Sequence, residues 1–145
     1  MTLAPTAVAQ MTIFMYFLPM ASDRRVVVVV VPGAQSLDVT GPLEAFAGAN
    51  GPGRARYRLV VASRAGGVIA TSSGLGLATV ALRALRPGRR DTVLVAGADE
   101  PGVRAAVADA ALVAWLARAA PVVERIGSVC TGALLLGAAG LLRGY

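Results

Sequence analysis

The run of valines at residues 26–31 constrains the fold of this chain more than any other stretch. Pro32 and Gly33 close the run. A continuous β-branched segment with no alternating polar side chains is expected for a strand that is buried on both faces, as in the middle of a parallel sheet. Helices must cover both faces of such a sheet, so this one run already favours an α/β fold.

Strand-like and helix-like patterns alternate along the rest of the chain. Apolar segments rich in β-branched residues predict further strands at 57–62, 92–96 and 123–129, and a short hairpin is expected within residues 66–82. The order is strand, helix, strand, hairpin, strand, helix, strand, helix. This order predicts an open, mainly parallel sheet with helices on both faces, of the flavodoxin-like kind.

Three helices are expected between these strands. In the first, Thr40 is the predicted N-cap and Pro42 suits the first turn, and the helix ends near Ala49. The second helix is expected to cover residues 101–120 without a break. Its apolar stripe is expected at Val103, Val107, Ala111 and Trp115. The third helix is expected at residues 131–142.

The composition excludes several kinds of site. The chain has 145 residues, of which 56% are hydrophobic, enough for one domain with a packed core. Cys130 is its one cysteine, so an internal disulfide and a cysteine-rich zinc site are excluded. The absence of histidine excludes a histidine-dependent triad and most transition-metal chemistry. We therefore expect no metal and no cofactor.

The formal net charge of +6 raises the question of nucleic acid as a partner. Every basic residue is an arginine, as expected from the codons of a GC-rich genome, and no lysine is present. The arginines are dispersed along the sequence, for example at Arg24, Arg58, Arg83, Arg104 and Arg125. No aromatic residues are interleaved with them to stack on bases. From the sequence we expect no direct DNA binding by this chain.

The first 22 residues carry no charged side chain. Residues 11–22 are apolar enough to suggest a signal peptide, but the usual basic segment before the apolar core is missing. Pro5, Gln10 and Pro19 argue against a membrane span. We therefore interpret residues 1–24 as a disordered extension or as the product of a start codon placed too far upstream. Residues 25–145 form the predicted α/β domain, and we expect a cytoplasmic protein with no membrane association.

Cys130 lies between the last predicted strand and the last predicted helix. Ser128, Cys130 and Gly132 give the spacing S-x-C-x-G, a variant of the nucleophile elbow, in which small neighbours let the backbone turn sharply beneath the reactive side chain. The N–H groups of Thr131 and Gly132 would face the sulfur and favour the thiolate, which is the reactive form. The alternative is a core cysteine that only packs, and the spacing leaves the two interpretations about equal.

Two other segments follow strands at the same edge of the predicted sheet, where ligands bind in open α/β folds. The first leads to Asp38, and the second contains Gly97 and Ala98. Asp38 is either a solvated or capping residue, or a carboxyl placed over the sulfur of Cys130. Beside a thiolate it would hold its proton more tightly, because adjacent anions repel, and it would then donate a hydrogen bond or a proton. Glu44 is a weaker candidate, since it lies a turn further into the helix.

The stretches SLDVTGPLEAF and SVCTGALLLGAAGLLRG closely resemble the ThiJ/PfpI superfamily, which is also described as class I glutamine amidotransferase-like. The resemblance covers about residues 25–145. Two branches of the superfamily share these signatures: isonitrile hydratase, and the sensor half of the GlxA-type AraC-family transcription regulators.

This resemblance implies roles for particular residues. Cys130 matches the elbow cysteine, Asp38 the acid beside it, and Thr131 the residue that follows the nucleophile in isonitrile hydratase. Gly97 and Ala98 match the backbone segment that forms an anion site, and Gly132 borders the ligand. The resemblance also implies a small-molecule ligand and a homodimer.

Three departures from the family pattern bear on function. The Pro-Gly-Gly sequence that usually follows the middle strand is replaced by residues 96–98, Ala-Gly-Ala. The sequence ends at Tyr145, before a Thr-Thr-His-Trp stretch and before the helix-turn-helix region of the regulators. We therefore expect a fragment that corresponds to the ligand-sensing domain of an AraC-family regulator. An enzyme of the isonitrile hydratase kind, a hydro-lyase, is the first alternative, and a non-functional remnant is the second.

Overall fold

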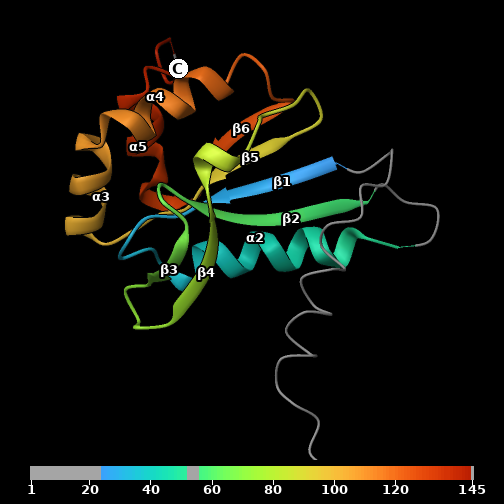
Figure 1. The fold of residues 1–145 in the computed structure, drawn as a ribbon, viewed down its shortest axis with the longest axis horizontal. Coiled ribbons are helices and arrows are strands. Elements are labelled where there is room, and N and C mark those ends of the chain that lie inside the picture. Colours follow the sequence, from blue (N-terminus) through green and yellow to red (C-terminus); the bar gives the residue numbers. More distant parts are fainter. Residues whose placement is uncertain (1–23, 52–55, 145) are drawn as a thin grey trace, which may run out of the picture.

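The computed structural model describes residues 24–51 and 56–144. Within these ranges the chain forms an open six-stranded sheet flanked by helices (Figure 1). The strands are β1 (Arg24–Val29), β2 (Tyr57–Ser63), β3 (Gly67–Ala70), β4 (Gly76–Ala81), β5 (Thr92–Val95) and β6 (Arg125–Ser128). The helices are α2 (Ser36–Ala49), α3 (Glu100–Ala108), α4 (Ala110–Ala119) and α5 (Ala133–Ala138), with 3₁₀ turns η1 (Leu82–Ala84) and η2 (Cys130–Gly132).

The strand order is β3-β4-β2-β1-β5-β6, and β3 alone pairs in the antiparallel direction, with β4. The valine run forms β1 and the residues just after it, between β2 and β5 in the middle of the sheet. Val26, Val28 and Val30 belong to the core on one face, and Val27, Val29 and Val31 to the core on the other. Each side of β1 is therefore buried by a different set of helices.

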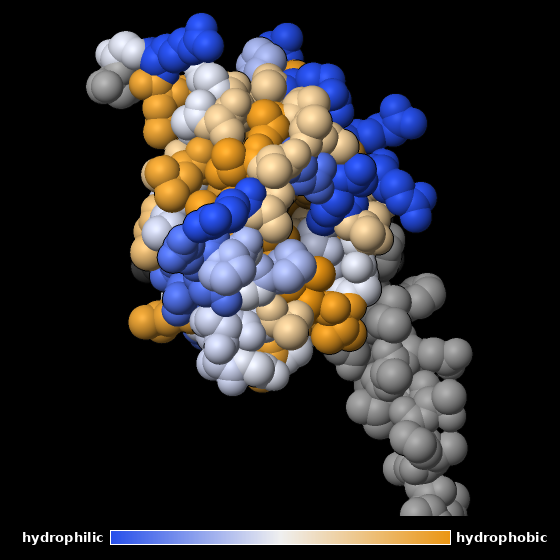
Figure 2. Space-filling model, turned by 90° about the vertical axis from the view of Figure 1, so that its left-hand side faces the viewer, coloured by the Kyte–Doolittle hydropathy of each residue, from blue (hydrophilic) through white to orange (hydrophobic). Residues whose placement is uncertain are grey.

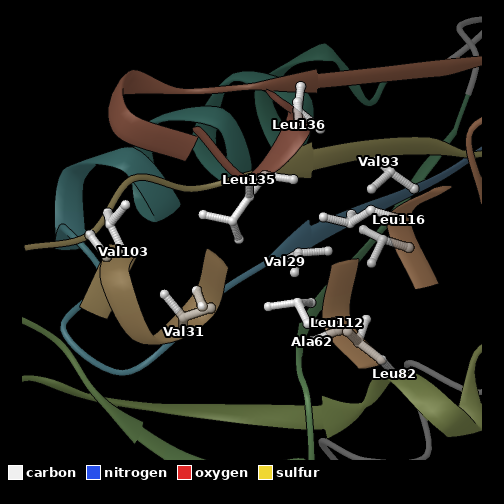
Figure 3. Close-up of a cluster of buried hydrophobic side chains, with 14 residues drawn as sticks. Val29, Val31, Ala62, Leu82, Val93, Val103, Leu112, Leu116, Leu135 and Leu136 are labelled. Atoms are coloured by element: carbon white, nitrogen blue, oxygen red, sulfur yellow. The ribbon is translucent and has the colours of Figure 1, made fainter. Parts of the chain in front are cut away.

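Helix α2 covers one face of the sheet, where Val39, Leu43 and Phe46 pack in the core. Helices α3, α4 and α5 cover the opposite face, and their buried side chains meet those of β1 and β5 (Figure 3). The predicted α/β fold with an open, mainly parallel sheet and helices on both faces is thus confirmed. The predicted strands at 26–31, 57–62, 92–96 and 123–129 are all present, with ends displaced by one or two residues.

Helix α2 begins earlier than predicted. Its N-cap is Gln35, which makes no side-chain capping bond, and Thr40 lies inside the helix with its hydroxyl donating to the carbonyl of Ser36 at 3.0 Å. The prediction of Thr40 as the cap was therefore wrong. The start is set instead by tertiary contact, because the N–H of Gln35 donates to the carbonyl of Gly97 at 2.9 Å. As a result Asp38 lies in the first turn of α2 and not in a preceding loop.

The predicted helix at 101–120 is two helices that meet at Asp109. The Asp109 carboxylate accepts hydrogen bonds from the N–H groups of Ala111 and Leu112, so it ends α3 and caps α4. The predicted apolar stripe assumed one unbroken helix and was wrong at two positions, because Val107 is 40% exposed and Ala111 is also exposed. Trp115 is partly buried against the core. The buried positions are Val103, Ala106, Leu112, Leu116 and Ala119.

The third helix is shorter than predicted. Residues 130–132 form the 3₁₀ turn η2, α5 then ends at Ala138, and residues 139–144 continue as turns with Gly140 at a φ of 76°. The interpretation of residues 1–24 as an extension lies outside the described residues, apart from Arg24, which begins β1. None of the helices within 24–51 and 56–144 has the length and hydropathy needed to span a membrane.

Replacing Leu116 by alanine tests the core beneath α4. Leu116 is 0% exposed within the core cluster on that face, so Leu116→Ala is expected to lower the free energy of unfolding by about 2–5 kcal/mol. The matched control is Leu134→Ala, which removes the same atoms from a side chain that is 56% exposed. This control is expected to change the free energy of unfolding by about 0.5 kcal/mol. Urea titration followed by circular dichroism measures both, and equal effects would contradict the described packing.

Candidate functional site

Cys130 occupies a sharp turn between β6 and η2. Its φ of 53° is the one positive value among the non-glycine residues that the structure describes. The strand is held up to this point, because the N–H of Val129 donates to the carbonyl of Val95 at 2.9 Å. The cysteine is free and exposed. A non-glycine residue in this region of φ costs on the order of 1–3 kcal/mol, so the surrounding structure must hold it there. The positive φ and the exposed side chain do not fit a buried core cysteine that only packs, and we refer to this turn below as the elbow.

Gly132 provides the space that the elbow needs. A Cβ atom at this position would lie 2.2 Å from the carbonyl oxygen of Val95 and 3.1 Å from that of Ala96. Both contacts are with backbone atoms of the neighbouring strand segment, which cannot move aside as a side chain can. The sequence prediction that a small residue follows the cysteine therefore has a direct steric cause.

Asp38, Cys130 and Thr131 come together around Gly97. A Cβ atom at Gly97 would lie 2.5 Å from Oδ2 of Asp38, 3.0 Å from Cβ of Cys130 and 3.0 Å from Oγ1 of Thr131. A side chain at this position would collide with all three residues, so glycine is what lets these residues, which the sequence singled out, lie so close together. Oδ2 of Asp38 is buried and finds no hydrogen-bond partner among the described residues. A buried carboxyl oxygen without a partner is costly, which marks Asp38 as a candidate functional residue.

The hydroxyl of Thr131 connects the elbow to the loop after β5. It accepts a hydrogen bond from the N–H of Ala98 at 3.0 Å and donates one to the carbonyl of Ala98 at 3.0 Å. Ala98 also forms an isolated bridge with Ala34, and it is only 5% exposed. The N–H of Ala98 is therefore already in use. Of the two residues that the family resemblance assigned to an anion site, Ala98 therefore has no free N–H to offer to an anion.

A pocket of about 280 Å³ adjoins this group of residues. It is lined by Ala98, Glu100, Val103, Arg104, Thr131 and Leu134. Arg104 and Glu100 form an ion pair with an N–O distance of 2.5 Å at its edge. Figure 2 faces the edge of the sheet at which the strands end, and it shows apolar side chains interspersed with hydrophilic ones. Sequence reasoning missed Val103, Arg104 and Leu134, although Leu134 follows Cys130 by one helical turn.

The other residues near the site have structural roles. The Asp99 side chain caps α3 by accepting from the N–H of Gly102 at 2.9 Å, and Glu44 is exposed. No cluster of histidine, cysteine, aspartate and glutamate that could hold a metal ion occurs in the described part of the chain. The chemistry available here is that of one exposed thiol, one buried carboxyl oxygen and the backbone around Gly97.

Comparison with known proteins places this geometry in context. The model of the DJ-1/PfpI family matches residues 24–145. An uncharacterised protein in the cpoL 5′ region of Streptomyces lividans is 42% identical over 125 residues, which make up 86% of this chain and 85% of that protein. A ThiJ/PfpI family protein from Pseudomonas syringae has a TM-score of 0.74 and 26% identity, over 100% of this chain and 54% of that chain.

A candidate transcriptional regulator from Vibrio parahaemolyticus has a TM-score of 0.69 and 18% identity, over 83% of this chain and 64% of that chain. At this identity the likeness shows the fold alone. The chain spans about half of the Pseudomonas structure and slightly less than two thirds of the Vibrio structure.

Substitution of Gly132 tests the steric requirement of the elbow. Gly132→Ala places a methyl group against backbone oxygens, so the free energy of unfolding is expected to fall by about 1–3 kcal/mol. Gly48→Ala is the matched control, because a Cβ at Gly48 meets nothing within 4 Å. Gly48 lies in the last turn of α2, so this substitution is expected to be neutral or to stabilise by up to about 0.5 kcal/mol. Urea titration of both variants checks the signs, and a neutral Gly132→Ala would contradict the described turn.

Proposed function

Because the chain belongs to the DJ-1/PfpI family, we propose that residues 24–145 are the ligand-sensing domain of an AraC-family transcription regulator. The observation that carries this proposal is the mutual hydrogen bonding of Ala98 and Thr131. An enzyme that adds a nucleophile to its substrate needs preorganised donors for the developing negative charge. At this site the N–H of Ala98 already donates to the hydroxyl oxygen of Thr131, and the hydroxyl proton of Thr131 already goes to the carbonyl of Ala98. Both donors are therefore occupied, which favours binding of a ligand over its turnover.

In this proposal Cys130 and Asp38 are the residues that contact the ligand. The thiol is exposed at the elbow, and Oδ2 of Asp38 is buried beside Gly97 with no hydrogen-bond partner among residues 24–51 and 56–144. The Asp38 carboxyl is the proposed hydrogen-bond partner of the sulfur or of a polar atom of the ligand. Gly97 lets Asp38, Cys130 and Thr131 lie close together, and Gly132 leaves room for the turn. Thr131 acts as a positioning residue. The homodimer and the cytoplasmic location implied by the family belong to the same proposal.

An enzyme of the isonitrile hydratase kind is the second candidate, and the strained φ of Cys130 favours it. Strain of this kind is typical of catalytic nucleophiles. In this reaction the thiolate adds to the isocyanide carbon, and Asp38 donates a proton to form a thioimidate. Water then adds to the same carbon and expels the thiolate, which leaves an N-substituted formamide. The balance is one isocyanide and one water consumed for each formamide released.

Alkylation of Cys130 tests the pairing with Asp38. At about pH 7 the thiol is expected to react with iodoacetamide faster than N-acetylcysteine does. Asp38→Ala is expected to slow the reaction by about tenfold, because a hydrogen bond to a charged group contributes about 1.5–3 kcal/mol. Asp38→Asn keeps a donor and is expected to restore part of the rate. Mass spectrometry follows the adduct, and Glu44→Ala on the exposed part of α2 is the control.

A rate that does not respond to either Asp38 substitution would show that the carboxyl plays no part in the chemistry of the thiol. Circular dichroism of each variant verifies that the fold is retained before the rates are compared.

The number of turnovers separates the two candidate functions. With an excess of an alkyl isocyanide, a sensing domain is expected to consume at most one equivalent per chain, because no step regenerates the free thiol. NMR spectroscopy of the solution measures isocyanide and formamide together. Formation of many equivalents of formamide by the intact chain, and none by Cys130→Ala, would overturn the sensor assignment in favour of the enzyme.

A further inference from the structure

A row of arginines lies at the edge of the sheet opposite Cys130. The adjacent parallel strands β2, β1, β5 and β6 all begin at this edge (Figure 1). Their register sets Arg25 beside Arg58, and Thr92 beside Arg125. We name this set the arginine row, and it consists of Arg58, Arg24, Arg25, Arg90 and Arg125. The exposed arginines around it are Arg56, Arg86, Arg89 and Arg118.

Only two carboxylates, Asp91 and Glu124, oppose this charge among the described residues of the edge. Asp91 binds Arg25 and accepts the N–H of Gly88. Glu124 binds Arg24 at 2.6 Å and Arg125 at 2.9 Å. The hydrogen bond from Arg24, together with the charges of Arg125 and Arg90, lowers the pKa of Glu124, so this carboxylate stays ionised and still leaves the surface cationic.

Several of the arginines have no carboxylate partner. Within residues 24–51 and 56–144 no ion pair involves Arg58, Arg86, Arg89 or Arg90. Arg89 also lines a pocket of about 380 Å³ with residues Pro121, Val122 and Val123. The guanidinium groups of Arg58, Arg86, Arg89 and Arg90 are therefore available to an external anion, whereas Arg24, Arg25 and Arg125 are ion-paired.

Neutralising the negative ends of helix dipoles does not require so many arginines. Helices α2 and α4 end at this edge, and the C-terminus of a helix carries the equivalent of about −0.5 charge. Two such ends amount to about one negative charge. The arginine row and its neighbours exceed this several times over, so a partner outside the chain is the better explanation.

The guanidinium groups and the length of the arginine row favour the phosphate backbone of a nucleic-acid duplex as the polyanion. Guanidinium groups bind phosphate oxygens in pairs of hydrogen bonds. Four neighbouring strands at a spacing of about 4.8 Å give a row about 14 Å long, which corresponds to about four phosphates along one strand of a duplex. Single-stranded nucleic acid is usually bound by stacking of bases on aromatic side chains. Tyr57, at the start of β2, packs its ring against Phe46 with centroids 4.9 Å apart and is not free for such stacking, which favours a duplex.

From this arrangement we propose that the arginine row binds the phosphate backbone of double-stranded DNA without reading its sequence. The expectation of no direct DNA binding rested in part on the dispersal of the arginines along the sequence. The register of the parallel strands brings these arginines together at one edge of the sheet. The inference is independent of the proposed ligand site, because it uses neither Cys130 nor Asp38.

Fluorescence anisotropy with a labelled random-sequence duplex tests the row. The full chain is expected to bind at about 50 mM salt and to lose affinity steeply toward about 200 mM. Arg89→Gln with Arg90→Gln is expected to weaken binding roughly tenfold at low salt and to reduce the slope of log K against log salt by about 2. The matched control is Arg64→Gln with Arg104→Gln, which removes the same net charge from the opposite half of the molecule. This control is expected to retain the affinity at low salt and the slope of log K against log salt.

Equal weakening by the two double variants would show that net charge alone drives binding and would overturn the proposal. Failure of the full chain to bind the duplex at about 50 mM salt would overturn it as well. Binding to vesicles of anionic phospholipid but not to the duplex would assign the row to a membrane instead. Cys130→Ala is expected to bind the duplex as the unmodified chain does, whatever the outcome at the ligand site.

Discussion

The burial of β1 on both faces is the constraint on which the rest of the structure depends. Its valines contribute alternately to two separate cores, so neither core can form unless helices cover both sides of the sheet. Burial of apolar side chains contributes about 25 cal/mol per Å², and the valine run supplies it in both directions at once. The loops after β1, β5 and β6 are consequently brought to one edge, and the candidate site consists of these loops.

That edge is held together by hydrogen bonds between loops and not by packing alone. Gly97 accepts from the N–H of Gln35, and Ala98 exchanges two hydrogen bonds with the hydroxyl of Thr131. These bonds join the loops after β1, β5 and β6 in series. They also help to keep Cys130 at a positive φ, since three hydrogen bonds worth about 1 kcal/mol each can offset a strain of about 1–3 kcal/mol. The same bonds occupy groups that an enzyme would direct at its substrate.

Much of this arrangement follows from the sequence. Buried strands were predictable because long apolar runs depend only on local pattern, and the meeting of Asp38 with Cys130 followed from the rule that parallel strands end at one edge. The start of α2 was not predictable, because a bond to Gly97 sets it and no capping residue marks it. The break at Asp109 was missed since aspartate is tolerated in a helical pattern. The use of the Ala98 N–H by Thr131 leaves no sequence signal, because one partner is backbone.

The two edges of the sheet are the opposite ends of the same strands, and their separation limits how they can influence each other. Strands of four to six residues, such as β5 and β1, are about 13–20 Å long. Exposed charges are screened over about 8 Å at physiological salt, so the field of the arginine row is largely lost before it reaches Cys130. Binding of a polyanion at one edge can therefore act on the thiol at the other only by moving the strands themselves. A strand buried in two cores resists such movement, and the two surfaces are expected to work independently.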